Sequence, residues 1–119
     1  MKILITATGN SLEAEVDPRF GRAKWFVVYD TDNDSAEFVD NSQNLDAPSG
    51  AGVQAGANAV KTGAKVVITG NCGPKAFRTL SAAGIKVVIG ATGSIREAAE
   101  KFKKGRYQYA NEANVEGGW

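Results

Sequence analysis

A short, continuously apolar segment that runs into a glycine-containing turn recurs in this chain and constrains its fold most. It occurs at residues 2–8 (Lys-Ile-Leu-Ile-Thr-Ala-Thr), 65–69 (Lys-Val-Val-Ile-Thr) and 85–89 (Ile-Lys-Val-Val-Ile). Strands that are apolar on both faces are typical of parallel sheets with helices on either side. The sequence therefore predicts an α/β domain.

Three helical patterns alternate with these strands. Residues 51–62 are rich in alanine, and residues 74–83 begin with a proline, which suits a first helical turn. The third helix follows Ser94, which forms a capping-box pattern with Glu97 three residues later. These patterns place helices between the strands and after the last one.

Two further strands, at residues 24–29 and 35–41, flank the polar turn 30–34 and predict an antiparallel hairpin. With right-handed crossovers, the order β-β-β-α-β-α-β-α predicts a mixed five-stranded sheet of order 3-2-1-4-5. Strand 2 is antiparallel to strand 1, and helices cover both faces, a ribonuclease-H-like arrangement. We expect residues 1–105 to form one domain and residues 106–119 to be a flexible tail.

The chain has 119 residues, one cysteine and no histidine. This composition excludes Ser-His and Cys-His catalytic pairs, histidine zinc sites and an internal disulfide, and it suits a reducing compartment. No apolar run is long enough to span a membrane, and residues 1–10 do not resemble a signal peptide. We therefore expect a cytoplasmic protein that binds no membrane.

The three apolar strands each run into small, polar, glycine-containing residues, at 9–11, 70–72 and 90–94. Ligands of open α/β sheets bind at the carboxyl ends of parallel strands, where glycines expose backbone N–H groups. The helices that begin near Pro74 and Ser94 would both direct positive N-terminal ends there. Each loop alone is better explained as a tight turn, but together they predict an anion site.

Basic side chains lie close to these loops in the sequence. Arg19 and Arg22 flank Phe20-Gly21, and guanidinium groups suit anions with several acceptor atoms. Lys75 lies in a first helical turn, where a cation opposes the helix dipole, and this cost favours a role in ligand binding. Incidental surface charge is the alternative explanation for all three.

Cys72 is the one candidate metal ligand. A helix N-terminus would lower the pKa of its thiol, and thiolate is a soft ligand for copper, iron or molybdenum–sulfur species. A buried, inert cysteine is the alternative. A conventional iron–sulfur cluster needs four thiolates, so backbone donors, charge and fit would have to hold any cluster. The candidate cofactor-binding residues are Asn10, Ser11, Arg19, Phe20, Gly21, Arg22, Asn71, Cys72, Gly73 and Lys75.

Four short motifs carry a family resemblance: 20–23 (Phe-Gly-Arg-Ala), 50–53 (Gly-Ala-Gly-Val), 73–77 (Gly-Pro-Lys-Ala-Phe) and 83–87 (Ala-Gly-Ile-Lys-Val). In their order and spacing the chain resembles the dinitrogenase iron–molybdenum cofactor biosynthesis family, over about residues 1–105. That family includes cofactor carriers and the orange proteins, which hold a molybdenum–copper cluster. The resemblance implies a ribonuclease-H-like fold and a noncovalently held metal–sulfur cluster of molybdenum with iron or copper.

Some carriers of the family use a histidine for their cofactor, and this chain has none, so it resembles the orange-protein-like members more. The expected function is carriage of an anionic cluster or cofactor precursor for assembly or storage, without enzymatic turnover. Expected partners are cluster donor and recipient proteins, with a P-loop ATPase among the candidates, and no nucleic acid. We expect a monomer. The alternatives are a module that docks a partner ATPase or nitrogenase-like protein, and a small hydrolase.

Overall fold

The computed structural model describes residues 1–42 and 50–116, and its elements follow the predicted order, with each boundary within a residue or two of the prediction. The elements are β1 (Lys2–Ala7), β2 (Trp25–Asp30), β3 (Ser35–Asp40), α1 (Ala51–Lys61), β4 (Val66–Ile68), α2 (Pro74–Ala82), β5 (Lys86–Val88) and α3 (Ile95–Lys103). Among the helices in these described ranges, none is long and apolar enough to cross a membrane.

The five strands form one sheet of order β3-β2-β1-β4-β5, which confirms the predicted topology. β1 pairs antiparallel with β2, with Ile3 opposite Tyr29, and parallel with β4, with Ile3 opposite Val66. β2 and β3 form the predicted hairpin, and β4 pairs parallel with β5. The carboxyl ends of β1, β4 and β5 consequently point the same way.

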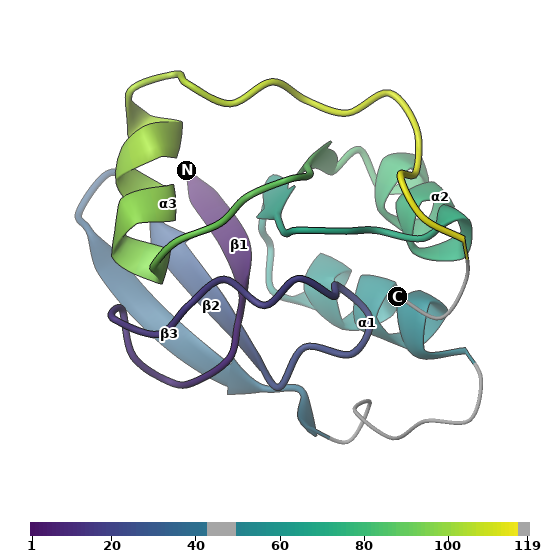
Figure 1. Ribbon diagram of the computed structural model, residues 1–119, viewed down its shortest axis with the longest axis horizontal. Helices are drawn as coiled ribbons and strands as arrows, with labels where there is room; N and C mark the ends of the chain where they lie inside the picture. Colours follow the sequence, from purple (N-terminus) through teal and green to yellow (C-terminus); the bar gives the residue numbers. More distant parts are fainter. Residues whose placement is uncertain (43–49, 117–119) are drawn as a thin grey trace.

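Helices cover both faces of this sheet, as Figure 1 shows. Ile3 and Ile5 of β1 belong to the apolar cluster that includes α3, whereas Leu4 belongs to the cluster that includes α1 and α2. Successive strand residues point to opposite faces. Burial on both faces therefore explains why the sequence of β1 is continuously apolar and does not alternate.

Residues 106–116, here called the C-terminal strap, run from α3 to α2 and are the yellow trace of Figure 1. The Tyr107 ring packs against the α3-side core, with Lys101 Nζ 5.4 Å from its centroid. The Ala110 N–H donates to Val87 O (2.7 Å) and so pairs with the outer edge of β5. Residues 106–116 thus follow a defined path along α3, β5 and α2. The mobility of the segment stays a prediction, and residues 117–119 lie outside the described residues.

Candidate functional site

The carboxyl ends of β1, β4 and β5 meet at one edge of the sheet. Thr6 Oγ1, on β1, lies 2.8 Å from Thr69 Oγ1, directly after β4. The Gly90 N–H, after β5, donates to Gly70 O (2.8 Å). The Ile-Thr pair that recurs at residues 5–6 and 68–69 is a sequence signal for the threonine contact, although neither threonine is among the predicted site residues. The convergence of strand ends that the topology predicts is thus present.

The long loop between β1 and β2 crosses this edge and ties the strand ends together. The Asp17 N–H donates to Thr6 O (2.8 Å), and Asp17 O lies 2.8 Å from Thr6 Oγ1. The Val16 N–H donates to Gly93 O (2.9 Å), on the other side of the edge. Backbone hydrogen bonds thereby hold residues 16–17 against two of the three strand ends.

The next residues of this loop lie against the turn that precedes α2. Arg19 and Asn71 form a parallel β-bridge, and the Phe20 N–H donates to Asn71 O (3.1 Å). Asn71 Nδ2 donates to Pro18 O (2.9 Å). Gly70 permits this contact, because a Cβ at Gly70 would lie 2.7 Å from Pro18 Cα. The structure therefore brings the Arg19–Arg22 loop beside the Asn71–Lys75 segment.

Asn10 and Ser11 belong to a different neighbourhood. Both residues are exposed, and Ser11 Oγ accepts a hydrogen bond from the Glu13 N–H (3.1 Å). The Leu12 O accepts from the Arg96 N–H (2.9 Å), which anchors this turn to the first turn of α3. Of the three predicted loops, the one at 9–11 therefore lies beside the N-terminus of α3, whereas the one at 70–72 lies beside Arg19.

The N-terminus of α2 has no capping side chain. Gly73 is its N-cap residue, Pro74 follows, and the first turn contains no acidic residue. The first intrahelical bond runs from the Phe77 N–H to Gly73 O (2.9 Å), which leaves the N–H groups of Lys75 and Ala76 without an intrahelical partner. Lys75 is exposed. This helix end therefore presents backbone donors, a positive dipole end and a cation.

A second helix end lies beside it. Gly50, the N-cap of α1, has φ 75° and no capping side chain, and the first turn of α1 also lacks an acidic residue. A Cβ at Gly52 would lie 3.2 Å from Ala76 Cβ, and one at Gly56 would lie 2.8 Å from Thr79 Cγ2. These contacts run in the same order along both helices. α1 and α2 therefore pack closely with their N-termini at the same end.

The N-terminus of α3 is satisfied by its own residues. Ser94 Oγ accepts from the Glu97 N–H (3.1 Å), and Glu97 Oε1 accepts from the Ser94 N–H (2.9 Å). The bond from the Ser94 backbone lowers the pKa of Glu97, and the Ser94 hydroxyl adds to this shift. The predicted capping box is confirmed. The Glu97 carboxylate therefore already lies at this helix end, and a ligand site there stays a prediction without support from this geometry.

Cys72 is fully buried, and burial raises the pKa of its thiol to about 12. This direction is opposite to the one predicted from its place before α2. Sγ lies 3.7 Å from Gly73 O, to which the thiol donates. Desolvation outweighs the helix dipole here, so the neutral thiol is the stable form. The role of Cys72 as a metal ligand stays a prediction, without support from this environment.

Phe20 and Gly21 are both buried, so their role as cofactor-binding residues stays a prediction without support from this environment. The Phe20 ring is fully buried and stacks on Phe26, with centroids 5.7 Å apart and planes at 14°. Gly73 is also buried, whereas Arg19 and Arg22 are half-buried. The Phe20 ring therefore anchors the loop that carries the two arginines.

Asn114, in the C-terminal strap, is a residue that sequence reasoning missed. Its Oδ1 accepts from the Cys72 N–H (2.8 Å), and its Nδ2 donates to Asn71 Oδ1 (2.9 Å). Its own N–H donates to Cys72 O (3.2 Å). The strap has no hydrophobic periodicity, so no local signal distinguishes Asn114 from its polar neighbours.

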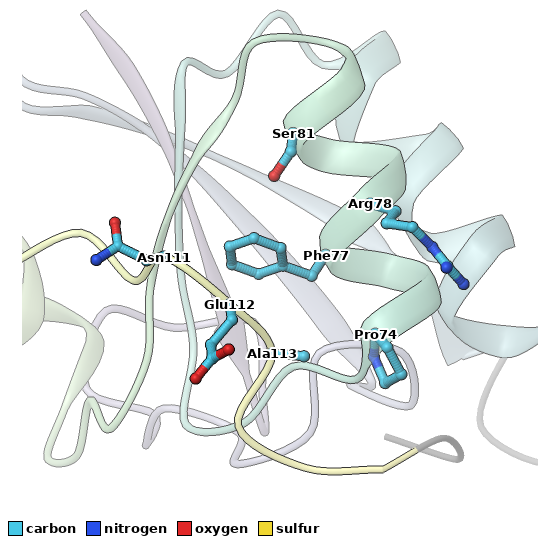
Figure 2. Close-up of a pocket in the computed structure, with 7 residues that line it drawn as sticks. All are labelled: Pro74, Phe77, Arg78, Ser81, Asn111, Glu112 and Ala113. Carbon is cyan, nitrogen blue, oxygen red and sulfur yellow. The ribbon is translucent and has the colours of Figure 1, made fainter.

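A cavity of about 470 Å³ separates α2 from the strap. Figure 2 shows the Phe77 ring pointing from α2 toward strap residues Asn111–Ala113. The lining residues are Pro74, Phe77, Arg78, Ser81, Asn111, Glu112 and Ala113. The strap thus spans a hollow between Ala110, where it pairs with β5, and Asn114.

The donor set at the α2 end suits an anion more than a bare metal ion. Within residues 1–42 and 50–116, no three His, Cys, Asp or Glu side chains lie close enough together to hold a metal ion. Backbone N–H groups of two helix ends, Lys75 and the loop that carries Arg19 and Arg22 are the groups present. These residues fit an anionic cluster that is bound as a whole, through its outer atoms.

Residues 1–105 match the family model described as dinitrogenase iron-molybdenum cofactor. The chain belongs to this family. The match covers the whole sheet and all three helices, and it ends just before the strap. The family resemblance inferred from the four sequence motifs is thereby confirmed.

Known proteins with similar chains agree with this membership. The apo form of the orange protein from Desulfovibrio gigas is 43% identical, with a TM-score of 0.93 and 96% of each chain covered. A NifB-like protein from Thermotoga is 35% identical, with a TM-score of 0.84 and 98% of each chain covered. An uncharacterised protein from Methanocaldococcus jannaschii is 28% identical over 91% of this chain and 90% of its own. Membership and these similarities support a cofactor-related role.

Proposed function

We propose that this protein is a carrier that binds an anionic metal–sulfur cluster, or a precursor of one, as its cargo. The binding site is the sheet edge where the N-termini of α1 and α2 lie beside the Arg19–Arg22 loop. The observation that carries the proposal is the bridge between Arg19 and Asn71, which brings this loop to the uncapped N-terminus of α2. Family membership and similarity to the orange protein support a metallocluster as the anion.

The physical basis of binding is electrostatic. A thiometallate presents sulfide acceptors and a negative charge, which the N–H groups of Lys75 and Ala76, the helix dipoles and the nearby cations all favour. A hydrogen bond to a charged group contributes about 1.5–3 kcal/mol, so a few such contacts can hold a cargo without covalent ligation. Because Cys72 is buried with a raised thiol pKa, we assign it to the lining of the loop and not to the metal.

The groups at this site are backbone N–H donors and cations, which bind anions. Ionised Arg and Lys side chains are neither nucleophiles nor general bases. We therefore infer a carrier and not an enzyme. The cargo would contain molybdenum with iron or copper, and the partners would be cluster donor and recipient proteins, including a P-loop ATPase. The ribonuclease-H-like classification belongs to the same proposal, since sheet order 3-2-1-4-5 with an antiparallel second strand is typical of that arrangement.

Optical titration of the full-length protein with tetrathiomolybdate, alone and with Cu(I), tests this function. Arg19→Ala should weaken binding by roughly 10- to 150-fold, the equivalent of one charge-assisted contact. Arg96→Ala is the matched control, because Arg96 is exposed, pairs with Glu13 (2.7 Å) and lies at the α3 end. Equal losses in the two variants, or no binding by the wild type, would contradict the proposed site.

A further inference from the structure

We propose that Asn114 of the C-terminal strap is a positioning residue for this anion site. The inference rests on the proposed function and extends it beyond residues 1–105, where the family model ends. In this proposal the strap holds the Asn71–Cys72 turn in place, and that turn directs the backbone donors of the first turn of α2 toward the cargo.

The hydrogen bonds of Asn114 carry this assignment. Its side-chain amide uses both of its polar atoms on the turn, with Oδ1 on the Cys72 N–H (2.8 Å) and Nδ2 on Asn71 Oδ1 (2.9 Å). Its backbone N–H adds a third bond, to Cys72 O. A single residue thus fixes the peptide units directly before Gly73, the N-cap of α2.

Asn71 connects Asn114 to the Arg19–Arg22 loop. Its Nδ2 donates to Pro18 O (2.9 Å), and its backbone forms the bridge with Arg19. A displacement of Asn71 would therefore move both the donors of α2 and the Arg19 backbone. Residues that orient the groups binding a ligand typically contribute 10- to 100-fold to affinity without touching it.

Because of the path of the strap, the restraint on the Asn71–Cys72 turn depends on Asn114. The strap is anchored upstream by the Tyr107 ring and by the pairing of Ala110 with Val87. Beyond Ala110 it crosses the cavity beside Phe77 (Figure 2). Within the described part of the chain, the hydrogen bonds that hold residues 111–116 are those of Asn114. Loss of its side chain should therefore remove two of the three bonds between strap and turn and loosen the Cys72 end of the turn.

The test uses three full-length variants and two measurements, which are tetrathiomolybdate affinity and amide hydrogen exchange without cargo. Asn114→Ala should bind about tenfold or more weakly, and its Cys72 amide should exchange faster while Val66–Ile68 keep their protection. Asn111→Ala is the matched control, because Asn111 is exposed on the same strap and makes no hydrogen bond within the described residues. It should leave both measurements unchanged.

Asn114→Asp separates positioning from charge. Its carboxylate keeps an acceptor for the Cys72 N–H, so that amide should exchange more slowly than in Asn114→Ala. The added negative charge should still weaken binding, and this loss should shrink as salt is raised, whereas the loss in Asn114→Ala should persist. Equal salt dependence of the two losses would mean that the cargo does not sense charge at position 114, which would contradict a place for this residue beside the site.

Three results would overturn the inference while leaving the proposed function intact. They are unchanged affinity in Asn114→Ala, an equal loss of protection at Cys72 and at Val66–Ile68, and equal salt dependence of the Asn114→Ala and Asn114→Asp losses. Failure of the wild type to bind tetrathiomolybdate would instead refute the proposed function, and the positioning role with it.

Discussion

The N-termini of α2 and α3 lie at the same edge of the sheet, but the backbone N–H groups of their first turns are satisfied differently. At α3, Ser94 and Glu97 satisfy each other's backbone N–H groups in a capping box. At α2, Gly73 and Pro74 supply no cap, and the first turn contains Lys75 in place of an acid. One helix end carries its own anion, and the other carries a cation.

This difference separates a structural helix end from one that is open to a ligand. A capping box provides stability but occupies the donors with which an external anion could bind. An uncapped end gives up that stability and keeps its first-turn donors available. In this chain the open end also lies beside the N-terminus of α1 and the Arg19–Arg22 loop. The comparison therefore locates the proposed anion site at α2 and not at α3.

The largest expected effect concerns the anchor of the arginine loop. Phe20→Ala should lower the free energy of unfolding by about 3–5 kcal/mol, because it removes a fully buried ring that stacks on Phe26. Arg19→Ala, one residue away and half-buried, should change stability far less. Urea unfolding of both variants checks the contrast. A similar, small loss in each would mean that Phe20 does not anchor the loop.

A second prediction tests whether burial or the helix dipole determines the thiol pKa of Cys72. Because its pKa is raised to about 12, the native thiol should react with iodoacetamide at pH 8 at least about a hundredfold more slowly than in urea-unfolded protein. A folded pKa above the unfolded value also means that stability falls as pH rises above about 9. Cys72→Ala should show a smaller fall, because only Tyr29 and Tyr107 then contribute among the buried or half-buried groups with a raised pKa. Rapid native alkylation would show that the α2 end lowers the thiol pKa.

The capping box predicts a smaller effect at the α3 end. Ser94→Ala should lower the free energy of unfolding by about 1 kcal/mol, since it removes the acceptor for the Glu97 N–H. Its affinity for tetrathiomolybdate should equal that of the wild type. Thermal unfolding and optical titration of one sample give both values, and a clear loss of affinity would assign α3 to the site.

The smallest effect is the pH dependence of that cap. The pKa of Glu97 is lowered in the folded protein from the ordinary value of 4.5. Its charge therefore stabilises the fold above that unfolded pKa, and this contribution disappears as pH falls through the folded value. Wild type should therefore exceed Glu97→Gln in stability at pH 7 and approach it below pH 4. A constant difference across this range would show that the carboxylate charge does not contribute.

The fold was predictable because its determinants are local. Residues 65–69 are apolar on both faces, and residues 24–41 form a hairpin around a polar turn, so strand order followed from crossover rules. The meeting of the ends of β1, β4 and β5 at one edge also followed from this topology.

The features that could not be predicted from the sequence depend on tertiary contacts. Phe20 lies in a stretch of loop residues, and its stacking partner Phe26 is recognisable only in the folded chain. Cys72 precedes a helix, which argues for a low thiol pKa, but full burial reverses the direction. Asn114 lies in a polar segment without periodicity, and its contacts join residues more than forty positions apart. No local sequence pattern predicts such long-range hydrogen bonds.

The measurement that tests the central claim most directly is an NMR titration of the apo-protein with tetrathiomolybdate and Cu(I). The amides of Lys75 and Ala76, together with those of Arg19–Arg22, should shift with a common saturation curve. The amide chemical shifts of Ile95–Glu97, in the capped first turn of α3, should change little. Shifts centred on Ile95–Glu97, or confined to the 30–41 hairpin, would contradict an anion site at the N-terminus of α2.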